Sequence, residues 1–248
     1  MITLPLFGVL FALHSATGAA RAAAVKPATP PVSVNIVHHK LKRGTTAAYQ
    51  ALEANIVSAY ERAKMPLYWL TFQAAKDPRD VLYLNVFNTP DGFEQASESF
   101  RTLSPAHPEL IRLSTRLTAM VEAQTSVLTT RRDEIAYTRS DVDFRNLHAL
   151  VLATYRIKPG HEGKFMDALR KAAGAGAPWL VYESNTDPTF VVIAPLKSRS
   201  EARHAVSLAG PLRALRGSYR ETREVYVLVP AISRRPTLAS SSRQASRP

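Results

Sequence analysis

The sequence predicts an α+β protein built from two consecutive βαββαβ units, and three observations lead to this prediction. Strand-like and helix-like segments follow one another in the same order twice along the 248 residues. Residues at the turns recur at matching places in both halves. Segments without the pattern of a packed element lie only at the two ends. A chain of this length can form two domains of about 100 residues each.

The first predicted unit spans residues 32–139. It begins with "VSVNIVHHKL", a run rich in β-branched residues that is typical of a strand. A helix follows whose apolar positions recur every three or four residues. These positions are Tyr49, Leu52, Ile56 and Tyr60. The runs "LYWLTFQA" and "VLYLNVF" predict two strands, Thr89-Pro90 opens a second helix, and "TSVLTT" predicts a closing strand.

The second predicted unit spans residues 146–232 and repeats this order. "LHALVLATYRI" predicts a strand, and the helix after it carries Phe165, Leu169 and Ala172 on one face. The runs "WLVYES" and "FVVIAPL" predict two strands, "SRSE" is a capping box that opens another helix, and "EVYVLV" predicts the closing strand. The order of elements is therefore the same in both halves.

Individual residues also match between the halves. At one constant offset, Leu41, Lys42, Gly44 and Tyr49 correspond to Ile157, Lys158, Gly160 and Phe165. Further pairs are Pro66 with Pro178, Asp77-Pro78 with Asp187-Pro188, and Val81-Leu82 with Val191-Val192. Order and anchors together indicate two ferredoxin-like units. The alternative is one irregular α+β domain.

A ferredoxin-like sheet with helices on one face leaves its other face bare, so another element must cover it. We expect the second unit to supply this cover, which would make the chain an internal pseudo-dimer with a small-molecule cavity between the two sheets. The period of two in a strand predicts that Leu82, Leu84 and Val86 meet the helices. Tyr83, Asn85 and Phe87 would then point into the cavity. The sequence does not decide which face Trp69 occupies.

The stretch "IKPGHEGKF", directly after a strand, resembles the first strand and helix of the dimeric α/β-barrel superfamily. This superfamily includes antibiotic-biosynthesis monooxygenases and NIPSNAP-like domains, and "TSVLTTRRDEIAY" is similar to the closing strand and tail of NIPSNAP-like members. The resemblance implies two ferredoxin-like sheets packed face to face, here within one chain. It also implies a cavity of the kind in which cofactor-free monooxygenases bind phenolic substrates, although none of their catalytic motifs transfers residue by residue.

Both ends of the chain are predicted to lie outside the fold. Residues 1–24 combine a short apolar run with A-x-A patterns, which is typical of a signal peptide, although no basic residue precedes the run. The alternative is a buried or disordered N-terminus. Residues 25–31 form a Pro-rich linker, and residues 233–248 predict a disordered basic tail. We therefore expect an exported protein, periplasmic or extracellular, that does not span a membrane after cleavage.

Charge and composition exclude several classes of site. Six of the basic residues lie in the leader, the linker and the tail: Arg21, Lys26, Arg234, Arg235, Arg243 and Arg247. Without them the formal charge falls from +12 to +6, which argues against a nucleic-acid partner. The chain has no cysteine, so disulfides and thiolate chemistry are excluded. The histidines show no metal-ligand spacing. We therefore expect neither a metal nor a cofactor.

His38 and His39 are the candidate catalytic residues. Adjacent residues of a strand point to opposite faces, so the two cannot bind one metal together. One of them could face the cavity and act as a general base near neutral pH. The alternative is one half-buried and one surface histidine.

The candidate ligand-binding residues are mostly in the first unit. They are Trp69, Tyr83, Asn85, Tyr155 and Glu183. An aromatic pocket with hydrogen-bonding groups would suit an apolar or aromatic ligand, whereas the alternative is ordinary barrel packing, with Glu183 on the surface. The matching of the two halves places Ile193 and Pro195 at the positions of Tyr83 and Asn85, so the second unit lacks these polar groups. One asymmetric site, or none, therefore fits better than two equal sites.

The sequence thus predicts an exported monomeric pseudo-dimer that binds a small apolar or aromatic ligand between its sheets, or acts as an interaction module. The alternative function is that of a cofactor-independent monooxygenase-like enzyme.

Overall fold

The computed structural model describes residues 30–137, 147–172, 179–198, 200–201, 208 and 210–235. Its strands are β1 (Ser33–Leu41), β2 (Trp69–Ala74), β3 (Asp80–Phe87), β4 (Val121–Arg131), β5 (Ala149–Ile157), β6 (Leu180–Ser184), β7 (Thr189–Leu196) and β8 (Tyr219–Leu228). Its α-helices are α1 (Thr46–Arg62), α2 (Gly92–Leu103), α3 (Pro108–Thr118) and α4 (Glu162–Ala172). Short 3-10 helices are η1 (Ser104–Ala106), η2 (Asp133–Ile135), η5 (Arg213–Leu215) and η6 (Pro230–Ile232).

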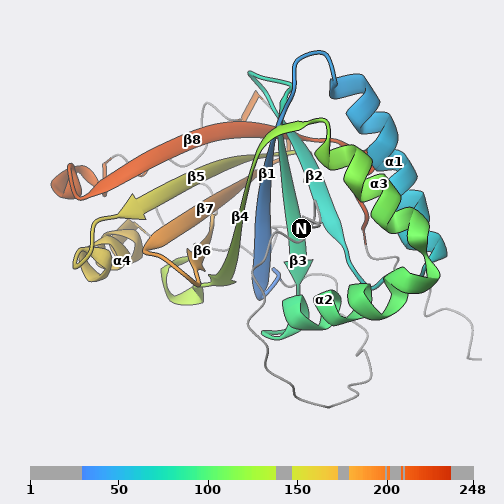
Figure 1. Ribbon diagram of the computed structural model, residues 1–248. Helices are drawn as coiled ribbons and strands as arrows, with labels where there is room; N and C mark the ends of the chain where they lie inside the picture. Colours follow the sequence, from blue (N-terminus) through green and yellow to red (C-terminus); the bar gives the residue numbers. More distant parts are fainter. Residues whose placement is uncertain are drawn as a thin grey trace, which may run out of the picture.

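All eight strands form one closed antiparallel barrel in the order β1-β3-β2-β8-β5-β7-β6-β4. Each unit contributes four neighbouring strands, and the pairs β2–β8 and β4–β6 join the two units. Helices α1, α2 and α3 cover the outer face of the first sheet, and α4 lies outside the second (Figure 1). The predicted α+β fold, two tandem ferredoxin-like units forming a dimeric α/β barrel within one chain, is confirmed.

Several predicted segments lie outside the described residues. They are the leader, most of the linker, most of the helix expected from Ser198 onward, and the tail after residue 235. Among the described residues, no helix has the length and apolar character needed to cross a membrane.

The inside of the barrel is filled by apolar side chains from both units, including Leu82, Leu84, Leu152 and Ile193. The predicted faces of β3 are therefore reversed, because its aliphatic side chains enter the barrel and Tyr83 packs with the helices. The reason is that a strand of a helix-covered barrel is buried on both faces, so hydrophobic alternation cannot show which face is inside.

The two units are interlocked by their C-terminal segments. η2 follows the last strand of the first unit, but Ile135 packs in the helix-side core of the second. Trp179 of the second unit donates its ring N–H to the carbonyl of Ile135 over 3.3 Å. In the same way, Trp69 of the first unit donates to the carbonyl of Ile232 in η6 over 2.9 Å. Each unit thus closes its core with the tail of the other.

Arg234 corrects the predicted boundary of the disordered tail at residue 233. Its side chain is buried, and its guanidinium donates to the carbonyl oxygens of Met65, over 2.6 Å, and of Leu67. Its main chain pairs with Trp69 in both directions. This contact was not predictable from apolar patterning, because the run Ser-Arg-Arg-Pro contains no apolar residue that signals burial. The contact instead uses main-chain groups of Trp69, which need hydrogen-bond partners whatever side chain the partner residue carries.

The strand registers correct part of the residue matching between the halves. His39 lies opposite Val81 in the first unit, whereas its counterpart Tyr155 lies opposite Phe190 in the second. The counterpart of Tyr83 is therefore Val192, one residue before the position that the sequence comparison assigned. A shift of one residue exchanges the two faces of a strand, which explains why the comparison misplaced this strand.

Glycine explains why the first turn has the same geometry in both units. Gly44 and Gly160 have φ angles of +78° and +81°, in the left-handed region that glycine adopts without strain. The resemblance between the two strand-to-helix stretches therefore reports a shared turn.

Candidate functional site

Four polar side chains form a cluster inside the helix-side core of the first unit. His39 comes from β1, Tyr49 and Glu53 from α1, and Tyr83 from β3, and none is more than 1% exposed. His39 Nδ1 and the Tyr49 hydroxyl are 2.5 Å apart, and the Tyr49 and Tyr83 hydroxyls share a hydrogen bond. A continuous hydrogen-bonded chain therefore runs from the histidine through two phenols toward the buried carboxyl. We call these four residues the polar cluster.

Local sequence explains how these side chains meet. Tyr49 and Glu53 are four residues apart on α1, so they lie on the same face of the helix. His39 and Tyr83 are on neighbouring strands, and their side chains project from the sheet toward the helices. Because α1 packs on the sheet, its two polar residues come into contact with His39 and Tyr83.

Glu53 is the unusual member of the polar cluster. Burial raises the pKa of its carboxyl from the ordinary 4.5 to about 8, so the group is mostly protonated at neutral pH. The Tyr83 hydroxyl is near enough to lower this pKa a little, but neither carboxyl oxygen has a hydrogen bond of normal geometry. Burial is the stronger effect because no full hydrogen bond opposes it.

The two tyrosines of the cluster stay protonated under the same conditions. Burial, and then the charge that Glu53 carries when ionised, hold the pKa of Tyr49 and Tyr83 well above its usual value. Phenols in this state can pass a proton along a hydrogen-bonded chain but do not keep a negative charge. Glu53 is therefore the group of the cluster with a pKa near neutral, and the two phenols link its surroundings to His39.

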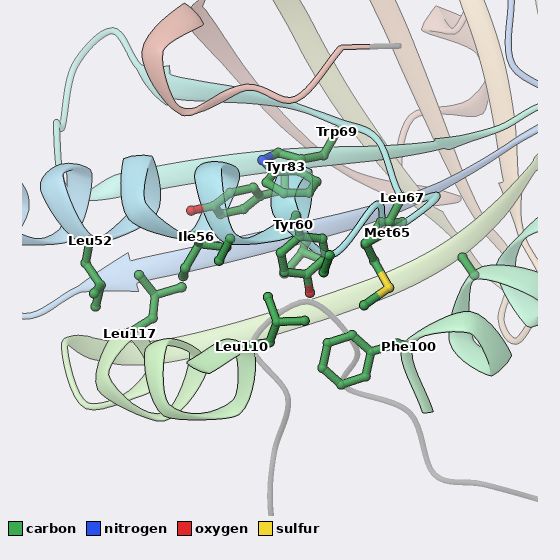
Figure 2. Packing of buried hydrophobic residues seen from close by; sticks show 14 of the residues in the cluster. Leu52, Ile56, Tyr60, Met65, Leu67, Trp69, Tyr83, Phe100, Leu110 and Leu117 are labelled. Carbon is green, nitrogen blue, oxygen red and sulfur yellow. The ribbon is translucent and has the colours of Figure 1, made fainter. Parts of the chain in front are cut away.

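Aromatic and sulfur-containing side chains surround the cluster. Tyr60, Met65, Trp69 and Phe100 belong to the same core and lie between the helices and the sheet (Figure 2). The rings of Tyr60 and Trp69 meet edge to face with their centres 5.2 Å apart. An apolar surrounding of this kind strengthens every charge interaction within it.

The second unit provides an internal comparison, because the same fold there does without the cluster. His39, Tyr49, Glu53 and Tyr83 correspond to Tyr155, Phe165, Leu169 and Val192. These four pack in the helix-side core of the second unit. The fold therefore does not require an acid, a histidine and two linked phenols at these positions.

Unsatisfied polar atoms also gather on this side of the first sheet. Asn85 Oδ1 and Asn35 Nδ2 are buried without a hydrogen-bond partner, although the Asn85 amide donates to the carbonyl of Asn35 over 3.3 Å. Their counterparts in the second unit are Ala194 and Val151, which are apolar. Unpaired buried groups cost stability, and the second unit avoids this cost at these two positions.

His38 lies on the opposite face of β1 from His39, at one end of the barrel. Its side chain is 32% exposed, its Nδ1 is 3.4 Å from Asp80 Oδ1, and its Nε2 is 3.4 Å from the Tyr226 hydroxyl. Tyr226 belongs to the inner core of the barrel. His38 is therefore the histidine on the inner face, and His39 is buried against the helices. The role of either as a base stays a prediction.

The predicted ligand-binding residues do not lie together between the sheets. Trp69 and Tyr83 pack in the helix-side core of the first unit, so they do not line a space between the sheets. Tyr155 packs in the equivalent core of the second unit, where its hydroxyl donates to Glu221 over 3.1 Å. Glu183 is half-buried and forms an ion pair with Arg132.

Tyr49 and Glu53 were not among the residues that the sequence predicted for a site. Tyr49 belongs to the predicted apolar stripe of the helix, and Glu53 lies four residues after it, on the same buried face. A carboxyl on the buried face of an amphipathic helix was the available signal. Among the described residues, no group of three His, Asp or Glu side chains could hold a metal ion.

The fold and the site define a dimeric α/β barrel formed by one chain, with a polar cluster in one of its two units. No protein family model matches the chain, and no curated protein does.

Solved structures with the same fold have low sequence identity. A proposed monooxygenase from Fusobacterium nucleatum is 10% identical, with 80% of this chain and 93% of that chain covered and a TM-score of 0.57. An anthrone oxidase-like protein is 10% identical, with 82% and 94% covered and a TM-score of 0.56. A chlorite dismutase variant from Candidatus Nitrospira defluvii is 8% identical, with 82% and 94% covered and a TM-score of 0.53. At these identities the likeness establishes the shared fold.

Proposed function

We propose that the polar cluster is the acid–base site of an enzyme of the cofactor-independent oxygenase type, acting on a small aromatic substrate. The observation that carries the proposal is Glu53, a buried carboxyl beside the hydrogen-bonded chain of His39, Tyr49 and Tyr83, whose counterpart in the second unit is Leu169. A strongly shifted pKa in a buried group with specific partners is characteristic of functional sites.

The chemistry that fits this site begins with the removal of a proton from an activated carbon. With a pKa of about 8, Glu53 is ionised in about a tenth of molecules at pH 7 and in half at pH 8. Its carboxylate takes the proton, and the tyrosine chain leads toward His39. The resulting carbanion, stabilised by its own aromatic system, is the species that reacts with dioxygen.

An anthrone is a suitable probe substrate because one of the solved neighbours is described as anthrone oxidase-like. In its oxidation two hydrogens leave one carbon, a C–O bond forms to dioxygen, and the O–O bond breaks. One oxygen atom stays as the new carbonyl and the other leaves as water, so one dioxygen is consumed for each anthraquinone formed. Dioxygen is the oxidant.

Access to the cluster requires movement of its cover. All four members are buried between α1 and the sheet, so a substrate reaches Glu53 only when part of the helical layer shifts. Tyr60, Trp69 and Phe100 offer aromatic surface on which a planar ring can stack once it has entered (Figure 2).

Dioxygen uptake with anthrone tests the proposal. We expect Glu53→Gln to lower the turnover rate by about 10²- to 10⁴-fold, the usual contribution of a general acid or base. His39→Gln should also lower it, whereas His38→Gln, a change of the same type on the opposite face of the strand, should leave it near the wild-type rate. Oxygen uptake that is unchanged in Glu53→Gln would show that the cluster is not the site. Saturable anthrone binding without oxygen uptake would show a binding protein instead.

Export remains a proposal that rests on residues 1–24 alone. Cell fractionation with N-terminal sequencing of the mature protein tests it. A new N-terminus near residue 25 in the exported fraction is expected, and full-length protein in the cytoplasm would contradict it.

A further inference from the structure

Helices α1 and α3 lie side by side on the outside of the first sheet (Figure 1), and side chains of both line a groove. It has a volume of about 450 Å³, within the range of about 300–1,000 Å³ that is typical of small-molecule sites. Its lining residues are Asn55, Ser58 and Arg62 of α1 and Glu109, Arg112, Leu113 and Arg116 of α3. Three of the seven are arginines.

The charges in this groove are not balanced. A hydrogen bond from its own backbone N–H, and then the nearby His107 and Arg62, lower the pKa of Glu109, so its charge is partly offset. In the part of the chain that the structure describes, Arg112 and Arg116 form neither an ion pair nor a hydrogen bond. They are four residues apart on α3, so their side chains project from the same face of the helix.

The uncharged lining residues complement the two free arginines. The Asn55 amide supplies further hydrogen-bond donors from the opposite wall, and the half-buried Leu113 supplies apolar surface. A guanidinium presents a planar fork of donors that matches the oxygens of a phosphate or carboxylate. Two adjacent forks with an apolar patch match an anionic head group on a compact organic body.

We propose that this groove binds a small organic oxyanion, held by Arg112 and Arg116. This site is separate from the polar cluster, because α1 directs Glu53 inward and Asn55 and Ser58 outward. The proposal therefore does not depend on the proposed oxygenase function.

Calorimetric titration with phenyl phosphate, benzoate and inorganic phosphate tests the proposal. We expect saturable binding of at least one of the organic anions, with an affinity that falls as salt is added. Arg112→Gln and Arg116→Gln should each weaken binding about tenfold or more, since each removes a charge-assisted pair of hydrogen bonds. Tighter binding of phenyl phosphate would assign a phosphate head group, and tighter binding of benzoate a carboxylate.

Two control variants make the result specific. Arg101→Gln removes the same charge from α2, where Arg101 pairs with Glu98 outside the groove, and should leave the dissociation constant unchanged. Glu53→Gln should also leave it unchanged. The proposal is overturned if no anion binds saturably at millimolar concentration, or if Arg101→Gln weakens binding as much as the two groove variants do.

Discussion

Replacing Glu53 with Leu is expected to raise the free energy of unfolding by about 3 kcal/mol at pH 7, because a pKa difference of one unit corresponds to about 1.4 kcal/mol. The wild-type carboxyl has a pKa of about 8 in the folded protein and an ordinary 4.5 in the unfolded chain. Holding the proton in the folded state therefore costs stability at any pH at which the unfolded chain has released it. Leucine, which the second unit carries at the corresponding position 169, removes this cost.

The direction of the pH dependence follows from the same values. Below about pH 4.5 the carboxyl is protonated in both states and contributes no pH dependence. Between about pH 4.5 and 8 only the unfolded chain ionises, so the stability of the wild-type protein falls as the pH rises. Above about pH 8 both states are ionised and the contribution becomes constant. Glu53→Leu should abolish the fall across this window.

Urea unfolding of both proteins between pH 4.5 and 8.5 measures this difference. Glu61→Leu is the matched control, because Glu61 lies on the exposed face of the same helix and should change stability little at any pH. A wild-type protein and a Glu53→Leu variant with parallel pH profiles would show that Glu53 ionises normally.

The stability and activity predictions for Glu53 have opposite signs, and this opposition is what a functional residue should show. A residue selected for folding would destabilise the protein when replaced by its apolar counterpart. A residue kept for chemistry can weaken the fold, and its removal then stabilises the protein while activity is lost. Measuring both effects on Glu53 variants therefore distinguishes a site from a packing defect.

The fold was predictable from the sequence because its signals are local and occur twice. Gly44 can be recognised in the sequence as a turn residue, and Gly160 recurs at the same place in the second unit. This recurrence predicted the tandem architecture, and the positive φ angles of both glycines agree with it. The closure of eight strands into one barrel follows from the need to cover the bare face of each sheet. These features do not depend on which residue faces which side.

The site was less predictable because it depends on side-chain direction. In β3, Tyr83 is buried under the helices and Leu84 is buried inside the barrel. The alternation therefore shows that the two residues lie on opposite faces, but it does not show which face is inside the barrel. The residues aligned with β3 in the second unit were displaced by one position, which hid the correspondence between Tyr83 and Val192. Glu53 could have been found, since a charged residue within an apolar helical stripe is visible in the sequence.

Truncation after Val229 is expected to lower the free energy of unfolding by about 5 kcal/mol, a large share of the about 5–15 kcal/mol that holds a typical domain together. It removes the buried Ile232, whose loss from a core costs about 2–3 kcal/mol. It also leaves the Trp69 ring N–H and the Thr71 hydroxyl without the Ile232 carbonyl, and each unpaired buried donor costs about 1–3 kcal/mol.

Truncation after Arg235 is the matched control, because it keeps η6 and the main-chain pairing of Arg234 with Trp69. We expect this shorter deletion to leave the unfolding midpoint close to that of the full chain. If both truncations have the same effect, the crossing segment does not hold the first unit.

The pseudo-symmetry of the barrel predicts that substitutions of Ile135 and Ile232 have matching effects. Ile135 closes the core of the second unit as Ile232 closes that of the first, so Ile232→Ala and Ile135→Ala should each cost about 2–4 kcal/mol. Because each tail belongs to one unit and packs on the other, either change should lower a single cooperative transition seen by calorimetry. Two separate transitions, each shifted by only one of the substitutions, would show that the units fold independently despite the closed barrel.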